Sequence, residues 1–417
     1  MIKKCRGPLV GMVFLLATVA LSGLAALAQA EAQPKALGGG AWQIDNFTGA
    51  AVIGILLRFD RPVTLDPGGV LAFGGSEVKD LEVSGRSVWI RVDVVRRGTL
   101  FVSLGKEDGI ARVRKAYWAR SGEERNGLVV RCLVEEFWNQ GDEESLAELA
   151  LADYILHTPS SSVPVPFDGV QMVRQGYVTA FPDLKITPEA VIAEGDTVVV
   201  RNTITGTHSG PLMGISPTGL PVTFTDICFH RLVNGKIAES WQSYDLLGIF
   251  QQIGVLPPMG RRDYTWGAPS DVTGQPGNPE MNQELIEYLV EQAWNSGNLG
   301  VIDDVVASDY VLHDPVFPMS IRGSEGFKEY VFAMNGPFPD AHITVEAIVA
   351  QGDMVAVRWT YTGTQEREMM GISATGRTVT LNGITIHRLA DEKIVESWFC
   401  YDMFGLLQQL RVIPPLQ

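Results

Sequence analysis

The sequence predicts an α+β fold: two tandem cone-shaped domains follow a small all-β domain, and in each cone three helices pack on a curved antiparallel sheet that encloses a pocket. Three observations support this. The chain has 417 residues, which exceeds the size at which a single hydrophobic core keeps growing. Its C-terminal two thirds repeat themselves. Within each repeat, apolar residues first follow the helical period and then alternate.

Composition and charge limit the classes of molecule that this protein is expected to bind. Hydrophobic residues make up 46% of the chain and charged residues 19%, which are ordinary values for a folded protein. The formal net charge is −15, which argues against nucleic acid and against an anionic membrane surface, because both attract clustered Lys and Arg. We therefore expect a small hydrophobic molecule as the ligand and no nucleic acid.

The first residues, 1–30, have the layout of a secretory signal peptide. Basic residues at Lys3, Lys4 and Arg6 precede an apolar run over 9–27, and Ala28-Gln29-Ala30 supplies the small residues of a cleavage site. The alternative is an uncleaved anchor, because the run approaches the length that spans a bilayer. We expect cleavage, which gives a secreted or periplasmic protein with no stable membrane insertion.

Residues 41–109 are predicted to form the small β-rich domain. Short β-rich runs cover Val52–Phe59, Ser87–Val95 and Thr99–Leu104, and turn signals such as Asp66-Pro67-Gly68-Gly69 separate them. This pattern indicates an antiparallel sandwich or barrel. The stretch contains no His and no Cys, so we expect a spacer or attachment role rather than chemistry.

Residues 124–258 and 279–415 are two copies of one domain, joined by a linker over 259–278 that is rich in Pro, Gly and Asn. The register between the copies is 156 residues at first and 157 after one insertion. The recurring segments include Tyr154-Ile155-Leu156-His157 with Tyr310-Val311-Leu312-His313, Phe181-Pro182-Asp183 with Phe338-Pro339-Asp340, and His230-Arg231-Leu232 with His387-Arg388-Leu389.

Each copy is predicted to begin with an amphipathic helix. In copy 1 its apolar stripe consists of Val130, Leu133, Val134, Phe137 and Trp138. Gly141 and then Asp142 end this helix and cap the next one. A third short helix ends near Phe181.

The pattern then changes to the alternation of an antiparallel sheet. Strands are expected over Thr197–Thr207, Pro221–His230 and Ile237–Leu246, and Asn234-Gly235 is the hairpin signal before the last strand.

Several segments of both copies are similar to those of one known family. They include the Phe-Pro-Asp before the sheet, Gly206-Thr207-His208-Ser209-Gly210, Gly214-Ile215-Ser216-Pro217-Thr218-Gly219, and the tails that begin at Tyr244-Asp245 and Tyr401-Asp402. Each copy resembles the SnoaL-like polyketide cyclases, or ester cyclases, which have the nuclear transport factor two-like cone fold.

The resemblance implies a cofactor-free intramolecular aldol ring closure, in which an Asp removes an acidic proton next to a carbonyl. In the family pattern this Asp directly follows the aromatic or basic residue of the last strand. Gln242 and Phe399 occupy that position here, and neither side chain accepts a proton at neutral pH. Cys228 and Thr385 occupy the position of the family's cavity His.

Other residues of copy 1 are candidates to replace the base. If the hairpin loop has three residues, 234–236, then Cys228 lies opposite Gln242 and Asp226 lies opposite Tyr244. Alternation then places five side chains on one face of the sheet: Asp226, Cys228, His230, Gln242 and Tyr244. We expect Asp226, His230 and Tyr244 to be the catalytic residues, with Cys228 and Gln242 as ligand contacts.

Copy 2 lacks a carboxylate on the corresponding face. The residues there are Gly383, Thr385, His387, Phe399 and Tyr401, and the last four are expected to contact ligand. His157 and His313 lie where the family has polar residues at the pocket mouth, although a capping role is an equal alternative. The spacing of the histidines matches no metal-ligand motif, so we expect neither a metal nor a cofactor.

Three functions follow as hypotheses. The first is an exported enzyme that acts on a small hydrophobic carbonyl or ester compound through acid/base chemistry in copy 1. The second is a non-catalytic binding protein for small hydrophobic ligands, because the family's Asp is missing from both copies. The third is a structural pair, in which the two copies pack sheet to sheet as a pseudo-dimer.

Overall fold

The computed structural model describes residues 35–36, 41–45, 52–59, 63, 65–73, 77–84, 86–94, 99–104, 113–119, 121–161, 163–257, 274–317 and 320–413. The predicted signal peptide and most of the predicted linker lie outside these residues. The chain divides into two compact units, Met1–Val129 and Val130–Gln417. No helix of the described residues has both the length and the apolar character needed to cross a membrane.

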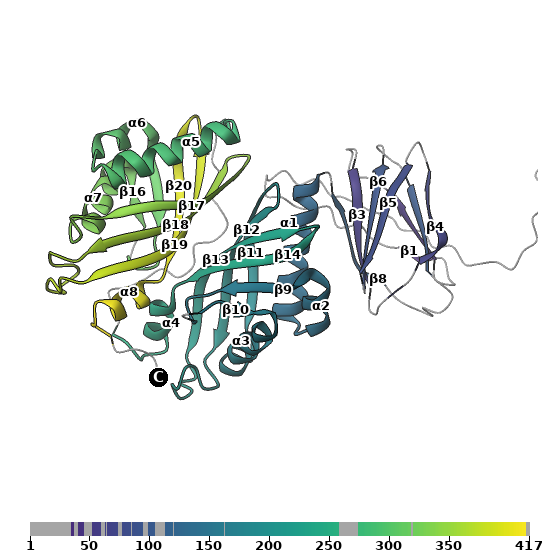
Figure 1. Ribbon diagram of the computed structural model, residues 1–417, viewed down its shortest axis with the longest axis horizontal. Helices are drawn as coiled ribbons and strands as arrows, with labels where there is room; N and C mark the ends of the chain where they lie inside the picture. The colour runs from purple at the N-terminus through teal and green to yellow at the C-terminus, as the bar shows by residue number, and fades with distance from the viewer. Residues whose placement is uncertain are drawn as a thin grey trace, which may run out of the picture. The chain divides into compact units, whose positions relative to one another are not determined.

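The first unit contains two four-stranded antiparallel sheets, with the strand orders β1-β2-β7-β4 and β5-β6-β3-β8 (Figure 1). Its strands are β1 Lys35–Ala36, β2 Ala41–Asp45, β3 Val52–Phe59, β4 Leu65–Phe73, β5 Glu77–Ser84, β6 Ser87–Val94, β7 Thr99–Leu104 and β8 Val113–Ala119. The runs predicted at β3, β6 and β7 are strands. The turn predicted at 66–69 instead lies inside β4, where the pairing with β7 slips between Leu65 and Val70.

Each copy in the second unit has a six-stranded sheet, in the orders β10-β9-β14-β13-β12-β11 and β16-β15-β20-β19-β18-β17. In copy 1 the strands are β9 Ala150–His157, β10 Val165–Pro166, β11 Lys185–Glu194, β12 Thr197–Thr207, β13 Pro221–Val233 and β14 Lys236–Tyr244. In copy 2 they are β15 Val306–His313, β16 Ile321–Arg322, β17 His342–Gln351, β18 Met354–Thr364, β19 Thr378–Ala390 and β20 Lys393–Tyr401. Neighbouring strands are antiparallel except β9 with β14 and β15 with β20, which run parallel. The predicted α+β class is confirmed, and the parallel pairs make the sheets mixed.

In each copy the helices gather on one side of the sheet, except the last helix, which lies apart from the others and next to its counterpart in the other copy (Figure 1). Copy 1 has α1 Gly122–Cys132, the π-helical turn η2 Leu133–Asn139, α2 Glu143–Leu149, α3 Phe167–Ala180 and α4 Leu246–Gln252. Copy 2 has α5 Pro279–Leu289, the π-helical turn η3 Val290–Asn295, the short 3₁₀ turn η4 Leu299–Val301, α6 Ile302–Val305, α7 Gly323–Asn335 and α8 Met403–Gln409. The first helix of copy 1 ends as predicted, because Gly141 adopts φ 76°, a conformation that glycine tolerates without strain.

The hairpin between β13 and β14 differs from the prediction in its loop but not in its register. The loop has two residues, Asn234 and Gly235, since Val233 pairs with Lys236. A bulge then leaves Ala238 without a partner strand residue, and the register beyond it restores the predicted pairs, including Asp226 with Tyr244. Two departures from the predicted hairpin therefore cancel, and the five predicted side chains share one face.

The recurring sequence segments have structural roles. Asp183 of the Phe-Pro-Asp segment accepts hydrogen bonds from the backbone N and the Oγ1 of Thr207, at 2.6 and 2.8 Å. These bonds lower the pKa of Asp183. In the Tyr-Asp tail, Asp245 caps α4 by accepting a hydrogen bond from the Gly248 N at 2.8 Å, and a Cβ at Gly248 would overlap that carboxylate.

The two copies contact each other, and the contacts are reciprocal. The Ala193 N donates to the Gln351 Oε1 at 3.0 Å, and the Ala350 N donates to the Glu194 Oε2 at 2.9 Å. The guanidinium of Arg201 lies 4.9 Å from the ring centre of Trp398, and that of Arg358 lies 4.4 Å from the ring centre of Trp241. Within each set, the two contacts join residues that correspond between the copies.

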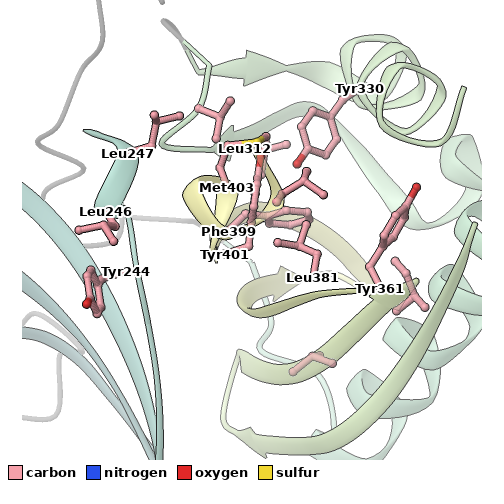
Figure 2. Packing of buried hydrophobic residues seen from close by; sticks show 14 of the residues in the cluster. Tyr244, Leu246, Leu247, Leu312, Tyr330, Tyr361, Leu381, Phe399, Tyr401 and Met403 are labelled. Carbon is pink, nitrogen blue, oxygen red and sulfur yellow. The ribbon is translucent and has the colours of Figure 1, made fainter. Parts of the chain in front are cut away.

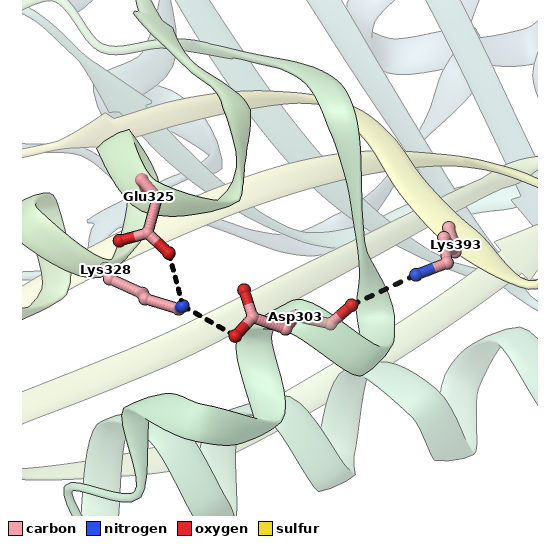
Figure 3. A network of polar contacts seen from close by, with 4 residues as sticks. All are labelled: Asp303, Glu325, Lys328 and Lys393. Carbon is pink, nitrogen blue, oxygen red and sulfur yellow. Dashed lines mark hydrogen bonds and ion pairs between the residues drawn. The ribbon is translucent and has the colours of Figure 1, made fainter.

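Two lysines of copy 2 make surface contacts between its helices and its sheet (Figure 3). The Lys328 Nζ of α7 donates to the Glu325 Oε1 at 2.6 Å and to the Asp303 Oδ2 of α6 at 2.7 Å. The Lys393 Nζ of β20 reaches the carbonyl oxygen of Asp303 at 3.1 Å. These contacts join α6, α7 and β20.

Candidate functional site

Copy 1 contains a cavity of about 40 Å³, which has room for about three water molecules. All five side chains that the sequence placed on one face line it: Asp226, Cys228, His230, Gln242 and Tyr244. Apolar residues of the helices and sheet, such as Val134 and Phe224, form much of the remaining wall. The cavity is therefore narrow and mainly apolar, with a polar cluster at one side.

Asp226 is the centre of that cluster. Its side chain is buried, and its Oδ1 accepts a hydrogen bond from the Asn202 Nδ2 at 2.7 Å. Its Oδ2 accepts from the Gln242 Nε2 at 2.8 Å and from the Cys228 Sγ at 3.4 Å. Burial raises the pKa of Asp226, while these hydrogen bonds act in the opposite direction. The result is a fixed carboxylate with increased basicity.

The position of Gln242 is itself fixed. Its Oε1 accepts a hydrogen bond from the Thr158 Oγ1 at 3.1 Å, so its amide nitrogen is directed at Asp226. A chain of hydrogen bonds therefore runs from Thr158 through Gln242 to Asp226. The carboxylate thus lies within hydrogen-bond distance of the side chain that occupies the position expected for the family's base.

His230 is neutral in the folded protein. Burial lowers its pKa to about 4, because no opposite charge compensates the loss of solvent. Its Nδ1 lies 2.7 Å from the Ser240 Oγ. Its Nε2 is buried and has no hydrogen-bond partner among the described residues. The imidazole thus offers the cavity one nitrogen that a ligand could satisfy.

Tyr244 forms a pair with Tyr177, a tyrosine that no sequence pattern indicated. The hydroxyl of Tyr177, on α3, donates to the Tyr244 Oη at 2.7 Å. Burial raises the pKa of both phenols, so both are neutral donors near neutral pH. Only the helical placement of α3 over β14 brings them together.

Copy 2 has a cavity of about 50 Å³ with a more aromatic wall. Four predicted ligand contacts line it, namely Thr385, His387, Phe399 and Tyr401. Figure 2 shows the side chains of Tyr330, Tyr361, Leu381 and Phe399 gathered in the interior of this copy. Further aromatic lining residues are Trp294, Phe338 and Trp359.

Copy 2 has a tryptophan and a glycine where copy 1 has the hydrogen-bonded pair Asn202 and Asp226. Trp359 stands where copy 1 has Asn202, and Gly383 stands where it has Asp226. A Cβ at Gly383 would overlap the Trp359 ring, so the glycine makes room for the indole. The Trp359 Nε1 donates to the Thr385 Oγ1 at 2.9 Å, which satisfies the polar atom of the large ring.

Copy 2 does hold a buried carboxylate, but it comes from another element. Asp314, at the end of β15, accepts hydrogen bonds from the hydroxyl groups of Tyr330 at 2.6 Å and Tyr401 at 2.9 Å. Its Oδ1 also accepts from the Val316 N at 2.7 Å. The sequence repeat could have indicated this carboxylate, because Asp314 replaces Thr158 after a His that both copies share. Its contact with α7, however, depends on the tertiary fold.

His157 and His313 do not line the cone cavities. The Nε2 of His157 lies 2.9 Å from the Glu239 Oε1, and the His157 ring stacks on Trp241. His313 makes the same contacts with Glu396, at 2.9 Å, and with Trp398. Both histidines are thus held against the last strand, outside the cavity that the sequence assigned to them.

No group of three or more His, Cys, Asp or Glu side chains is placed to hold a metal ion in the described ranges.

Comparison with known proteins gives one family for both copies. The model of the SnoaL-like polyketide cyclases matches residues 128–253 and 284–410, together more than half of the chain. Both ranges fall inside the copies that the sequence predicts. Among curated proteins, no sequence matches this one.

Several solved structures match single copies. The SnoaL-like protein of Jannaschia sp. CCS1 is 29% identical, covering 33% of this chain and 98% of its own, with a TM-score of 0.31. IdmH of Streptomyces antibioticus is 32% identical over 31% of this chain and 99% of its own, with a TM-score of 0.29. TsrD of Streptomyces laurentii is 26% identical over 33% and 99%, with a TM-score of 0.30.

Proposed function

Because the chain belongs to the SnoaL-like polyketide cyclase family, we propose that copy 1 is a cofactor-free enzyme acting on a small hydrophobic carbonyl compound. Asp226 is the base that removes the acidic proton next to the carbonyl. The observation that carries this proposal is the 2.8 Å hydrogen bond between the Gln242 Nε2 and the Asp226 Oδ2. Asp226 lies on the strand next to that of Gln242, and both residues line the same cavity.

The surroundings of Asp226 suit proton abstraction. A base works best when its pKa approaches the working pH, and burial shifts the pKa of Asp226 in that direction. The apolar wall excludes water, which strengthens the interaction between the carboxylate and an acidic C–H. Asn202 and Gln242 hold the carboxylate in one orientation.

His230 and Tyr244 complete the site as hydrogen-bond donors. When the proton passes from carbon to Asp226, negative charge develops on the carbonyl oxygen and needs donors in place. The Tyr244 hydroxyl and the Nε2–H tautomer of His230 provide them. The enolate carbon then attacks a second carbonyl carbon, and Asp226 returns the proton to the resulting alkoxide. The product is an isomer of the substrate, and no cofactor takes part.

Deuterium exchange tests the proton abstraction directly. Cyclopentanone is a compact ketone, and deuterium incorporation next to its carbonyl is followed by NMR in heavy water. We expect wild-type protein to accelerate incorporation and Asp226→Asn to reduce the acceleration by at least about a hundredfold, the usual contribution of a general base. The rate falls as pH drops, because protonation removes the base.

A double variant separates loss of the base from loss of the fold. Asp226→Asn with Gln242→Asp returns a carboxylate to the position where the family has it, and we expect exchange to recover. Wild-type exchange at the buffer rate, or full activity of Asp226→Asn, would overturn the proposal. Cooperative unfolding of each variant, measured by circular dichroism, shows that the site and not the fold has changed.

Copy 2 is proposed as a binding cavity rather than a catalytic one. Phe399 occupies the position of the family's base, and the only buried carboxylate beside this cavity in the described residues, Asp314, is engaged by two phenols. An aromatic wall binds small hydrophobic molecules without chemistry. Native mass spectrometry of protein from its own host tests this. We expect a bound ligand in the single variant Asp226→Asn and no bound ligand in the double variant Asp226→Asn/Phe399→Asp. Equal loading of both variants would contradict it.

The two copies are proposed to act as one pseudo-dimer. Reciprocal contacts such as Arg201 with Trp398 and Arg358 with Trp241 are those of a two-fold interface contained in one chain. Light scattering should then give a monomer mass.

Export is proposed from the N-terminal signal layout alone. N-terminal sequencing of protein from the host should begin at Glu31, and an intact Met1 would contradict cleavage.

A further inference from the structure

A third cavity lies between the two copies and is much larger than either cone cavity. Its volume is about 880 Å³, compared with about 40 and 50 Å³ for the cones. Small-molecule sites commonly measure about 300–1,000 Å³. Its walls combine residues of copy 1, such as Trp241 and Gln242, with residues of copy 2, such as Arg358 and Trp359.

Arg358 gives this cavity a positive charge. Its guanidinium lies over the Trp241 ring, 4.4 Å from the ring centre, and its Nε is buried with no hydrogen-bond partner among the described residues. A ligand in the cavity cannot reach the buried Nε, so an anionic group would bind the terminal nitrogens of the guanidinium, where a charge-assisted hydrogen bond is stronger than one between neutral groups.

The carboxylates near Arg358 have other partners. Glu346, whose charge acts on Arg358 most strongly, accepts from the Thr360 Oγ1 at 3.0 Å. Glu239 accepts from His157 at 2.9 Å and from Arg231 at 3.0 Å. Asp402, which lines the cavity, caps α8 by accepting from the Gly405 N at 2.8 Å. No ion pair of the described residues includes Arg358. The cavity therefore presents a cation to whatever enters it.

Two tryptophans belong to the remaining wall. Trp241 and Trp359 both line the cavity, one from each copy. The Trp241 ring is stacked on His157 and lies under the Arg358 guanidinium, and the Trp359 indole packs beside Gly383 and Tyr401 in copy 2, so Arg358 is the recognition element and it favours a carboxylate. We infer that the cavity between the copies is a second binding site, for a small organic acid whose carboxylate is placed at Arg358.

Binding at this site is separate from catalysis in copy 1, although the two cavities share one wall residue. Gln242 lines both cavities, and its amide holds Asp226 on one side. The residue that orients the base is therefore also part of the wall of the larger cavity. Binding at this site does not require copy 1 to be active.

Naphthoate and naphthamide are a matched pair of probes, because they share the planar body and differ in charge. Isothermal titration calorimetry should show wild-type protein binding naphthoate more tightly than naphthamide. Arg358→Met should weaken naphthoate by at least about tenfold, the equivalent of one charge-assisted hydrogen bond, and change naphthamide by less than about twofold. Arg358→Lys keeps the charge and should retain most of the naphthoate affinity.

A second variant locates the binding. Asn382 is exposed on β19 and lines the cavity, so Asn382→Phe fills it while leaving Arg358 in place. We expect this variant to lose both probes, and Asp226→Asn to keep both. Naphthoate affinity that survives Arg358→Met or Asn382→Phe would overturn the inference. An equal loss of both probes in Arg358→Met would also overturn it, because charge would then play no part.

Discussion

The cavities of copy 1 and copy 2 have the same strands in the same register but opposite chemistry. Asp226 pairs with Tyr244 in copy 1 as Gly383 pairs with Tyr401 in copy 2. In copy 1 the wall carries a carboxylate with an amide on each side, and in copy 2 an indole occupies that space. Three exchanged positions on adjacent strands thus accompany the change from a polar cluster to an aromatic wall: Asn202 to Trp359, Asp226 to Gly383 and Gln242 to Phe399.

The histidines are the feature that the two cavities share. His230 lies 2.7 Å from the Ser240 Oγ, and His387 lies 2.8 Å from the Ser397 Oγ. Burial lowers the pKa of His230 to about 4 and that of His387 to about 3. Burial alone accounts for both shifts.

These shifts give the largest predicted effect, a loss of stability in acid. Both folded-state pKa values lie below the unfolded value of about 6.5, so the neutral form favours folding. The stabilisation is complete above about pH 6.5 and is lost as the pH falls toward each folded pKa. At 1.36 kcal/mol per unit, the full loss is about 5 kcal/mol for His387 and about 3 kcal/mol for His230.

Asparagine variants measure the two contributions. His387→Asn and His230→Asn keep a hydrogen-bonding side chain that does not titrate, so each should flatten the dependence of the unfolding free energy on pH. The two curves should coincide down to about pH 4 and separate below it, with His387→Asn the flatter. Denaturant titrations at a series of pH values test this, and an unchanged slope in His387→Asn would show that its ring is charged in the folded state.

The next largest predicted effect on the unfolding free energy concerns Gly383 and Trp359, which occupy the positions of Asp226 and Asn202. Gly383→Asp drives a side chain into the Trp359 ring and should lower the unfolding free energy by about 3 kcal/mol, as overpacking does. Trp359→Asn alone should cost a similar amount by leaving a cavity. The double variant reproduces the copy 1 pair and should cost clearly less than the sum of the two. Additive losses in a double-mutant cycle would mean that the two positions do not compensate each other.

The sequence was sufficient for the fold and for much of the copy 1 site, because both depend on local patterns. Alternation placed Asp226, His230 and Tyr244 on one face, and the structure puts all three on the cavity wall. The register survived an incorrect loop length only because the bulge at Ala238 compensated for it. A one-residue difference without that bulge would have turned these side chains to the other face.

Contacts between elements distant in sequence could not be predicted. Asp314 meets Tyr330 because α7 packs against the end of β15, and the sequence offers no period that links a loop aspartate to a helix. The same limit applies to His157, whose position depends on the parallel pairing of β9 with β14. Short strands at the start of a helical region carry too little alternation to reveal such a pairing.

The smallest predicted effect concerns the outer surfaces of the two copies, where α7 carries Lys328 and α3 carries Gln171 in the corresponding position. Lys328 joins Asp303 and Glu325, but both carboxylates are solvent-exposed, and such ion pairs contribute little because water and salt screen them. Lys328→Gln should therefore leave the thermal unfolding midpoint unchanged within experimental scatter at physiological salt, and any difference should grow as the salt concentration is lowered. A large, salt-independent loss would instead mean that the alkyl chain of Lys328 packs against copy 2 in a way that the glutamine of copy 1 does not reproduce.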